Sequence, residues 1–214
     1  MKSKEKKQMM MINNKPLFIH TLLQFENHPA IDEIILVCPS ENKTDFSDFV
    51  FNFKLAKVKK IVDGGKERQD SVSNGLTMVD AHADIILVHD AVRPFISAEL
   101  IESIIESLTV NKAAVIATTI SNTVKRVHNG LVEATVDREQ LWSVQTPQGM
   151  QAAIFRDCYR NVANESFIGT DEAMIAEHCG IPVSIVSGSK KNIKVTTPDD
   201  LDLVNFMMKE KHEN

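Results

Sequence analysis

Charged residues of this 214-residue chain stand directly after short apolar runs, which is where α/β proteins place their ligand sites. Asp90 follows the run IILVH, and Arg93 comes three residues later in HDAVRPF. A carboxylate and a guanidinium at the end of a buried strand could form part of such a site. Asp90 could equally cap the next segment, with Arg93 as its ion-pair partner, and position alone leaves both interpretations open.

A second candidate is the stretch VDGGKERQDSV at 62–72, which places two glycines between an expected strand and an expected helix. Backbone N–H groups at a helix start can hold an anion or a base. The stretch matches neither GxGxxG nor GxxxxGK[ST], so as a phosphate motif it is weak, and a plain strand-to-helix turn is the simpler interpretation.

Two further polar residues have ordinary explanations. Lys194 alternates with Ile193 and Val195, which puts its side chain on the opposite face of an extended segment and makes it a lysine of an exposed face. His89 stands between Val88 and Asp90, where a packed, hydrogen-bonded histidine is more common than a base.

The elements that must position these residues alternate between strand and helix. Short apolar runs rich in Ile and Val indicate buried strands, and apolar residues at helical spacing indicate helices. We expect strands at 32–38, 58–63, 84–90, 113–118, 182–186 and 192–196, and helices at 15–26, 67–79, 98–108, 151–164, 171–178 and after Pro198. This order predicts an α/β fold with a mostly parallel sheet whose ligand site lies at the carboxyl ends of the strands.

Residues 119–148 depart from that alternation. SNTVKRVHNGLVEATVD contains two runs of alternating polar and apolar residues around His128-Asn129-Gly130, and Asn-Gly is the strongest short hairpin signal. We expect a β-arm that protrudes from the core.

Length and composition limit the possible classes. At 214 residues the chain fits one domain, spanning 1–214. The formal net charge of −5 disfavours a nucleic-acid binder or an anionic-membrane binder. There is no apolar run of membrane-spanning length and no signal-peptide pattern, and the three cysteines, Cys38, Cys158 and Cys179, are far apart without a CxxC pair. We therefore expect a soluble, cytoplasmic protein.

Six blocks of the sequence become informative when they are taken together: GGKERQDSVSNGL (64–76), VHDAVRPFI (88–96), NTVKRV (122–127), TVDREQLWSVQTPQ (135–148), TDEA (170–173) and NIKVTTPDDL (192–201). In this order and spacing they strongly resemble the 2-C-methyl-D-erythritol 4-phosphate cytidylyltransferases, from residue 7 to about residue 209. Any one block alone would be a weak signal.

The resemblance implies a Rossmann-like nucleotidyltransferase fold and a homodimer whose arms at 119–148 cross between subunits. It also implies the reaction of CTP with methylerythritol phosphate, which releases pyrophosphate and serves isoprenoid precursor synthesis. Attack of a phosphate oxygen on the α-phosphorus of CTP builds charge on the departing pyrophosphate. Such a site needs preorganised cations and Mg²⁺, or another divalent cation, more than it needs a base.

Residue roles also follow from the resemblance. Gly64, Gly65, Lys66 and Ser71 would hold the cytosine. Asp90 would face the ribose and the Mg²⁺ region. The polyol phosphate would be bound by Asp90, Arg93, Thr123, Arg138, Thr146 and Lys194, with Thr123 and Arg138 delivered by the arm of the other subunit. Lys7, Arg138 and Lys194 would be the catalytic cations.

The opening MKSKEKKQMMMINNKP lacks an apolar strand before the first helix. In the family that this sequence resembles, a buried first strand and a Gly-rich loop containing an arginine precede the position of Lys7. We expect that segment to be missing here, as if translation had been assigned to an internal methionine. We expect the chain without it to be at least ~100-fold less active, because losing one transition-state donor costs ~10² to 10³ in rate.

Two alternatives remain open at this point. A cytidylyltransferase for another polyol phosphate, such as ribitol 5-phosphate, would share the fold and the GG…R..S, HD..RP and QTPQ patterns. A non-catalytic dimeric protein that has lost the triphosphate loop is the alternative from a different class. A dehydrogenase is disfavoured, because none of the eight glycines forms GxGxxG after a strand.

Overall fold

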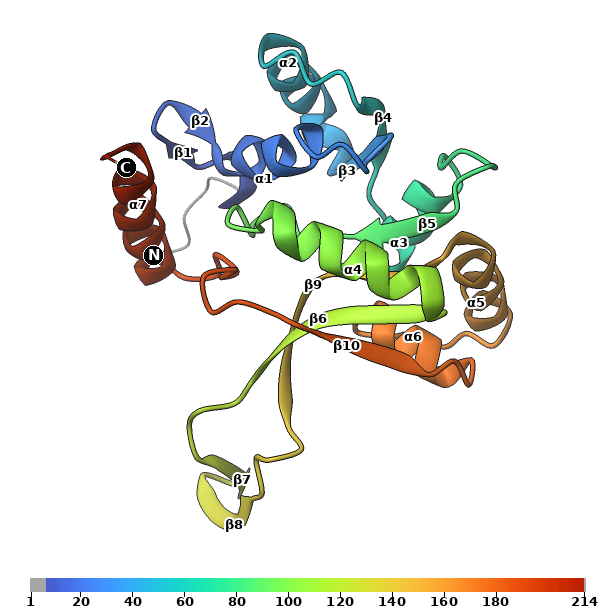
Figure 1. The fold of residues 1–214 in the computed structure, drawn as a ribbon, viewed down its shortest axis with the longest axis vertical. Helices are drawn as coiled ribbons and strands as arrows, with labels where there is room; N and C mark the ends of the chain where they lie inside the picture. The colour runs from blue at the N-terminus through green and yellow to red at the C-terminus, as the bar shows by residue number, and fades with distance from the viewer. Residues whose placement is uncertain (1–6, 214) are drawn as a thin grey trace.

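The computed structural model describes the backbone of residues 7–213 and the side chains of residues 7–209 (Figure 1). Its helices are η1 (Lys7–Met9), α1 (Leu17–Glu26), η2 (Ser40–Asn42), α2 (Lys43–Asn52), α3 (Arg68–Leu76), α4 (Ala98–Val110), α5 (Ala152–Asn164), α6 (Glu172–His178) and α7 (Pro198–Glu213), where η marks a 3₁₀ helix. Its strands are β1 (Met11–Ile12), β2 (Lys15–Pro16), β3 (Ile34–Cys38), β4 (Val58–Asp63), β5 (Ile85–Val88), β6 (Ala113–Thr119), β7 (Val124–His128), β8 (Leu131–Val136), β9 (Trp142–Gln151) and β10 (Val183–Ser187).

The predicted α/β class is confirmed, and the strands outside the arm form two sheets besides the small β1-β2 pair. One sheet has the order β10-β6-β9-β5, and a separate pair consists of β3 and β4. The β10-β6 and β3-β4 pairs are parallel. Strand β9 runs antiparallel to both β5 and β6, because it returns from the arm toward the body. Within the described residues, no strand joins β3 to β5.

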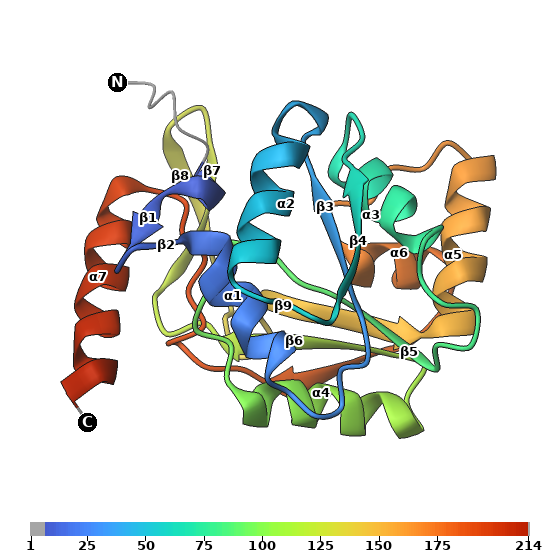
Figure 2. The same cartoon turned by 90° about the horizontal axis from the view of Figure 1, so that it is seen from above.

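Helices cover both faces of the four-stranded sheet, with α4 on one face and α3, α5 and α6 on the other (Figure 2). Alternate residues of β6 enter different clusters, as the two-residue repeat of a strand requires. Ala114 and Ile116 pack with Ile104 of α4. Ala113 packs with Phe155 of α5. Burial on both faces explains why this strand reads as a continuous apolar run.

Helix α4 illustrates how the sequence sets an element. The hydroxyl of Ser97 accepts a hydrogen bond from the backbone N–H of Leu100 and so caps the first turn. Ile101, Ile104 and Leu108 recur at helical spacing and have no solvent-exposed area. Burying each such side chain contributes about 1.5 to 3 kcal/mol.

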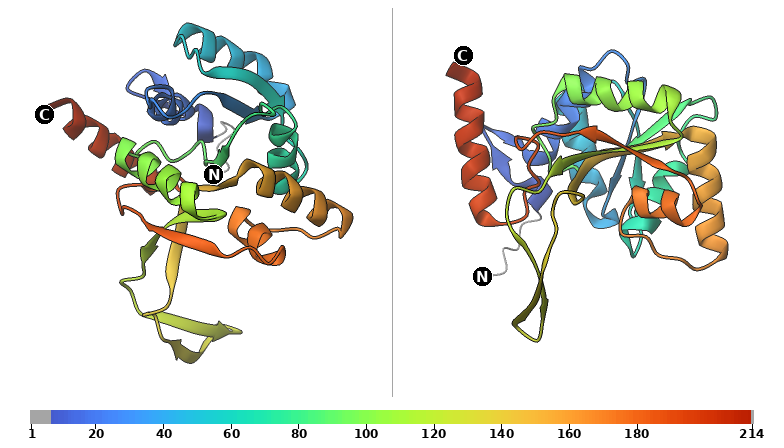
Figure 3. Two further views of the ribbon diagram at one scale, coloured as in Figure 1. Left: turned by 45° about the vertical axis from the view of Figure 1, so that its right-hand side comes forward. Right: turned by 60° about the horizontal axis from the view of Figure 1, so that its bottom comes forward.

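The arm is a β7-β8 hairpin that extends away from the body (Figures 1 and 3). Asn129 and Gly130 form its turn with φ angles of 47° and 79°, a backbone conformation that suits Asn and Gly. Val127, Leu131 and Val132 on the hairpin are 54%, 74% and 62% exposed. The hairpin prediction is confirmed, and it presents apolar side chains to the outside.

Three features differ from the expectation. The four-stranded sheet is mixed, with β10-β6 parallel and β9 antiparallel to both of its neighbours, where a mostly parallel sheet was expected. Helix α2 was not predicted, although its apolar residues do recur at the helical spacing i, i+3, i+4 and i+7 and pack into one cluster: Phe46, Phe49, Val50 and Phe53. The strand predicted at 192–196 does not form. Its backbone has other partners: the carbonyl of Asn192 accepts from the guanidinium of Arg93, and the N–H of Val195 donates to the carbonyl of Val92.

Candidate active site

The predicted strand-end residues meet just beyond the carboxyl end of β5. Lys194 Nζ lies 2.9 Å from Asp90 Oδ2, and Arg93 Nε lies 3.4 Å from the same oxygen. The backbone N–H of Arg93 donates to the carbonyl of Asp90, and this turn folds Arg93 back over the carboxylate. The ion-pair interpretation of Asp90 is therefore confirmed, and the interpretation as part of a ligand site stays a prediction.

The charge of Asp90 is maintained by its neighbours. Burial on its own would raise the pKa of this carboxyl, but the hydrogen bond and charge of Lys194, together with the charges of Arg68 and Arg93, lower the pKa below its ordinary value. Asp90 is therefore ionised at neutral pH and holds the cations in place.

A buried hydrogen-bond network holds the end of β5 against β9. The backbone N–H of Asp90 donates to Thr146 Oγ1 at 3.1 Å, and Thr146 Oγ1 lies 3.1 Å from His89 Nδ1. His89 Nε2 lies 3.2 Å from the carbonyl oxygen of Arg93. Since a carbonyl only accepts, we assign the His89 proton to Nε2, which leaves Nδ1 to accept from the Thr146 hydroxyl. His89 is thus a packed structural residue, as the sequence suggested.

Lys194 reaches the cluster because its segment is held in place by buried polar contacts. Arg93 Nη1 donates to the carbonyl of Asn192 at 2.8 Å, and Asn192 Nδ2 donates to the carbonyl of Thr146 at 2.9 Å. Asn192 has no exposed area. The residue after Lys194, Val195, packs in a buried cluster with Leu17 and Val204, away from Asp90. The alternation seen in the sequence survives, although the segment is not a strand.

A pocket of about 160 Å³ opens at this cluster. Its lining consists of Arg68, Asp90, Arg93, Val144, Gln145, Thr146, Gln148, Thr170, Asp171 and Lys194. The pocket offers three cationic side chains, those of Arg68, Arg93 and Lys194. The carboxylates of Asp90, Asp171 and the Arg68 partner Glu172 balance their charge, but the N–H groups of the cations can still bind an anionic substrate. The sequence identified Asp90, Arg93, Thr146 and Lys194 but not the third cation, Arg68. The only sequence signal for Arg68 was its position at the end of GGKER, directly after the two glycines.

The residues predicted to hold cytosine form the loop between β4 and α3, outside the lining of this pocket. The N–H of Gly65 donates to Ser71 Oγ at 3.0 Å, and the Ser71 hydroxyl donates to the carbonyl of Glu67 at 3.2 Å. A Cβ on Gly65 would lie 2.2 Å from the Cβ of Asp70, so this close approach requires glycine. Lys66 is exposed beside Gly64 and Gly65.

The remaining predicted residues do not line the pocket. Lys7 Nζ donates to the carbonyl of Thr196, two residues beyond Lys194, so Lys7 lies near the pocket on the side of the 192–196 segment. Arg138 Nη1 donates to the carbonyl of Ser121 at the base of the arm, close in sequence to Thr123. Within one chain, Thr123 and Arg138 therefore lie at the arm and do not line the pocket around Asp90.

A metal bound by protein groups alone has little support. The described residues contain no group of three or more His, Cys, Asp or Glu side chains that could hold a metal ion. Asp90 offers one carboxylate in a pocket suited to phosphates. Mg²⁺ commonly binds through one or two carboxylates together with substrate phosphates, so the donor set fits a metal that arrives with a nucleotide.

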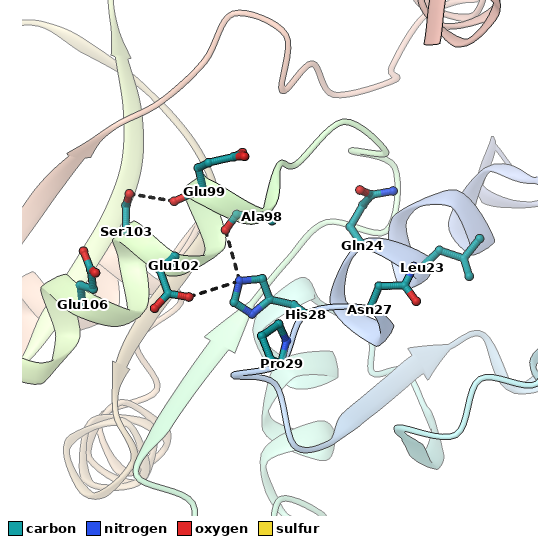
Figure 4. Close-up of a pocket in the computed structure, with 10 residues that line it drawn as sticks. All are labelled: Leu23, Gln24, Asn27, His28, Pro29, Ala98, Glu99, Glu102, Ser103 and Glu106. Atoms are coloured by element: carbon teal, nitrogen blue, oxygen red, sulfur yellow. Dashed lines mark hydrogen bonds and ion pairs between the residues drawn. The ribbon is translucent and has the colours of Figure 1, made fainter. Parts of the chain in front are cut away.

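A larger pocket, of about 600 Å³, lies between the end of α1 and the face of α4 (Figure 4). His28 Nε2 lies 3.2 Å from the carbonyl oxygen of Ala98 and 3.5 Å from Glu102 Oε2. Glu99 and Glu106 add two more carboxylates to the lining. None of the predicted residues lies here, and three glutamates disfavour an anionic substrate.

The fold and the cationic pocket together define an α/β nucleotidyltransferase. The 4-diphosphocytidyl-2C-methyl-D-erythritol synthase of Anaerococcus prevotii matches with a TM-score of 0.86 at 29% identity, covering 94% of this chain and 93% of that chain. The 2-C-methyl-D-erythritol 4-phosphate cytidylyltransferase of Francisella tularensis matches with a TM-score of 0.83 at 31% identity, covering 94% and 93%.

Sequence comparison identifies the family. The family model described as 2-C-methyl-D-erythritol 4-phosphate cytidylyltransferase matches residues 1–210. The enzyme of that name from Syntrophus aciditrophicus is 41% identical over 98% of this chain and 90% of its own length. That of Bacillus velezensis is 39% identical over 100% of this chain and 92% of its own length. The chain belongs to the 2-C-methyl-D-erythritol 4-phosphate cytidylyltransferase family.

Proposed function

We propose that the protein transfers the cytidylyl group of CTP to 2-C-methyl-D-erythritol 4-phosphate. A phosphate oxygen of the acceptor forms a bond to the α-phosphorus of CTP, and the bond between the α- and β-phosphates breaks. The products are the CDP-linked polyol and pyrophosphate, in isoprenoid precursor biosynthesis. The single observation that carries the proposal is the cluster of Arg68, Arg93 and Lys194 around Asp90 in a chain of this family.

The cluster suits this reaction electrostatically. Both substrates are phosphate anions, and the transition state places more charge on the departing pyrophosphate. Lys194 is 44% exposed at its side chain, so it can move from Asp90 to a substrate phosphate. The guanidinium of Arg93 is fixed by its hydrogen bond to the carbonyl of Asn192. We therefore propose that Arg93 orients the acceptor phosphate and does not move during the reaction. We propose that Lys7, near Thr196, is a further cation at this site.

A divalent cation belongs to the proposal. Asp90 is the residue that would contact it, together with phosphate oxygens of the nucleotide. When bound, such a cation would neutralise phosphate charge and polarise the α-phosphorus.

Cytosine recognition is assigned to the loop of Gly64, Gly65, Lys66 and Ser71. The loop adjoins the pocket because it ends at Arg68, which is the first residue of α3 and lines the pocket. A base edge satisfied by backbone groups leaves those groups unpaired when the wrong base enters, so CTP should be preferred over UTP.

A homodimer completes the proposal. The arm extends outward and exposes Val127, Leu131 and Val132, and an isologous contact through the two arms would cover them. In that assembly the arm would carry Thr123 and Arg138 to the acceptor phosphate of the other subunit.

Other interpretations have less support. The relatives compared above carry the methylerythritol phosphate name, which favours that acceptor over ribitol 5-phosphate.

None of the described helices is long and apolar enough to cross a membrane. A cytoplasmic location stays a prediction.

Pyrophosphate release tests the proposal directly. We expect release from CTP with methylerythritol phosphate, and much less with ribitol 5-phosphate or with UTP. A faster reaction with ribitol 5-phosphate would show that ribitol 5-phosphate is the preferred acceptor. No release with any acceptor, at a protein concentration at which dimers form, would favour the non-catalytic interpretation.

A further inference from the structure

The Arg68 side chain at the pocket is held by an ion pair with the buried Glu172. Arg68 Nη1 and Nη2 donate to Glu172 Oε1 and Oε2, both at 2.7 Å. This two-bond geometry fixes the plane of the guanidinium as well as its position. Glu172 is 1% exposed and also accepts from the Tyr159 hydroxyl at 3.2 Å. The pair therefore has a buried, fixed end at Glu172 and a half-exposed end at the pocket.

The pair is the centre of a longer connection. Gln69 Nε2 donates to the carbonyl of Phe167 at 3.0 Å, and Gln69 Oε1 accepts from the N–H of Gly169 at 2.7 Å. Two consecutive residues at the start of α3 are thus bound to residues 167–172, the segment that leads into α6. We call residues 167–172 the connecting segment.

The connecting segment is bound in turn to β9. Gln148 Nε2 donates to Asp171 Oδ2 at 3.1 Å, and Gln148 Oε1 accepts from the N–H of Ala173 at 2.9 Å. Gln148 is 2% exposed and stands two residues after Thr146, which contacts the end of β5. A path of partly buried hydrogen bonds, joined by the short backbone stretches 169–171 and 146–148, therefore links the start of α3 to the Asp90 cluster.

From this geometry we infer that Arg68 is a positioning residue that sets the loop at 64–67 relative to the Asp90 cluster, and so determines base selectivity. The inference rests on the proposed function. Arg68 is the first residue after that loop, so holding its guanidinium on Glu172 restrains the backbone where the loop ends. The hydrogen bond between Gly65 and Ser71 fixes the internal shape of the loop, and the N–H of Gly64 ties its start to the carbonyl of Cys38 on β3. Neither contact connects the end of the loop to the Asp90 cluster. A misplacement of about 1 Å can cost ~100-fold in rate.

The charge of Arg68 alone does not explain its placement. Its partner Glu172 is fully buried, and the hydrogen bond and charge of Glu172 raise the pKa of Arg68 despite burial, which disfavours the neutral form. A lysine would keep the positive charge but could not make two parallel bonds to one carboxylate. Arg68→Lys therefore separates positioning from charge.

The experiment measures kcat/KM for CTP and for UTP with methylerythritol phosphate, in the wild type and in Arg68→Lys, Arg68→Met and Gln69→Met. The ratio of the two values does not depend on how much of the protein is folded. We expect all three variants to lower the CTP/UTP ratio by about tenfold or more, since the loop loses its register. Arg160→Met is the matched control, because it breaks the exposed Arg160–Asp157 pair on α5 and should leave the ratio unchanged.

The outcomes separate the two claims. A wild type that releases no pyrophosphate with CTP contradicts the proposed function itself. An active wild type whose ratio persists in Arg68→Met overturns the inference, as does full recovery of the ratio in Arg68→Lys, which would assign Arg68 a charge role. Should Arg68→Met fail to fold because Glu172 is left unpaired, Arg68→Lys decides, since it keeps a positive charge beside Glu172 and removes only the two-bond geometry. Gln69→Met then tests whether the adjacent bonds act in the same way.

Discussion

Lys194 Nζ lies 2.9 Å from Asp90 Oδ2, although the two residues come from opposite halves of the chain. Asp90 follows a strand of the central sheet, whereas Lys194 lies on an irregular segment that Asn192 and Val195 hold in place. Asp90 Oδ2 also lies 3.4 Å from Arg93 Nε, so one carboxylate oxygen contacts both cations. A cation held by a carboxylate in the free protein is available for a substrate phosphate.

Replacing Lys194 tests that role. Lys194→Met should lower kcat by ~10² to 10³, because it removes one preorganised donor aimed at developing charge. Lys191→Met is the matched control, since Lys191 is exposed in the same segment and does not line the pocket. Unchanged kcat in Lys194→Met would remove Lys194 from the catalytic group.

His89 should make the protein sensitive to mild acid. Burial lowers the pKa of His89 from 6.5 to about 4. The unfolded chain then takes up a proton below about pH 6.5 that the folded protein does not take up until about pH 4, so acidification favours unfolding in that window. Between pH 7 and pH 5 this residue should cost about 2 kcal/mol of the free energy of unfolding.

Urea unfolding at fixed protein concentration measures this cost. His89→Gln cannot take up the proton, so its stability should fall by about 2 kcal/mol less than that of the wild type between pH 7 and pH 5. An identical fall in both proteins would show that other groups cause the acid sensitivity.

Two adjacent glycines should respond differently to a methyl group. In Gly65→Ala the new Cβ would lie 2.2 Å from the Cβ of Asp70, so the loop must move, at a cost of about 1 to 3 kcal/mol. In Gly64→Ala the nearest atom is the Ser71 hydroxyl oxygen at 3.3 Å, which a small side-chain shift relieves. We expect KM for CTP to rise strongly only in Gly65→Ala. Equal effects in both variants would contradict the assignment of the loop to the base.

Mixed dimers test the arm. If Arg138 acts on the other subunit and Lys7 on its own, Arg138→Ala and Lys7→Ala homodimers should both be nearly inactive. A dimer with one chain of each kind has one site with both defects and one intact site. It should recover about half of the activity of a wild-type dimer, because independent sites contribute separately. Mixed dimers as inactive as the parents would place Arg138 in its own subunit.

The sequence predicted the parts that depend on short-range patterns. The strand at 58–63 and the hairpin turn at Asn129-Gly130 were located correctly, because apolar runs and Asn-Gly turns are local signals. The approach of Lys194 to Asp90 was predicted only through the family resemblance, since the contact depends on tertiary folding.

Other contacts could not be predicted locally. Nothing near Arg68 in the sequence indicates Glu172 as its partner, because the pair forms only when α3 and α6 pack. The expected strand at 192–196 failed for a related reason: the carbonyl of Asn192 is bound to a guanidinium, and a distant side chain outweighed the local β pattern.

The division of the strands into two sheets also has a consequence for native-state opening. Strand β3 pairs only with β4 among the described strands, and β4 exposes Lys59, Lys60 and Asp63, whereas residues 113–117 of β6 are buried between two paired neighbours. Regions with fewer buried apolar contacts open at lower free energy than the core. The β3-β4 pair should therefore behave as a separate cooperative unit, whose amides exchange with deuterium well before those of β6 and β9 while the four-stranded sheet stays protected.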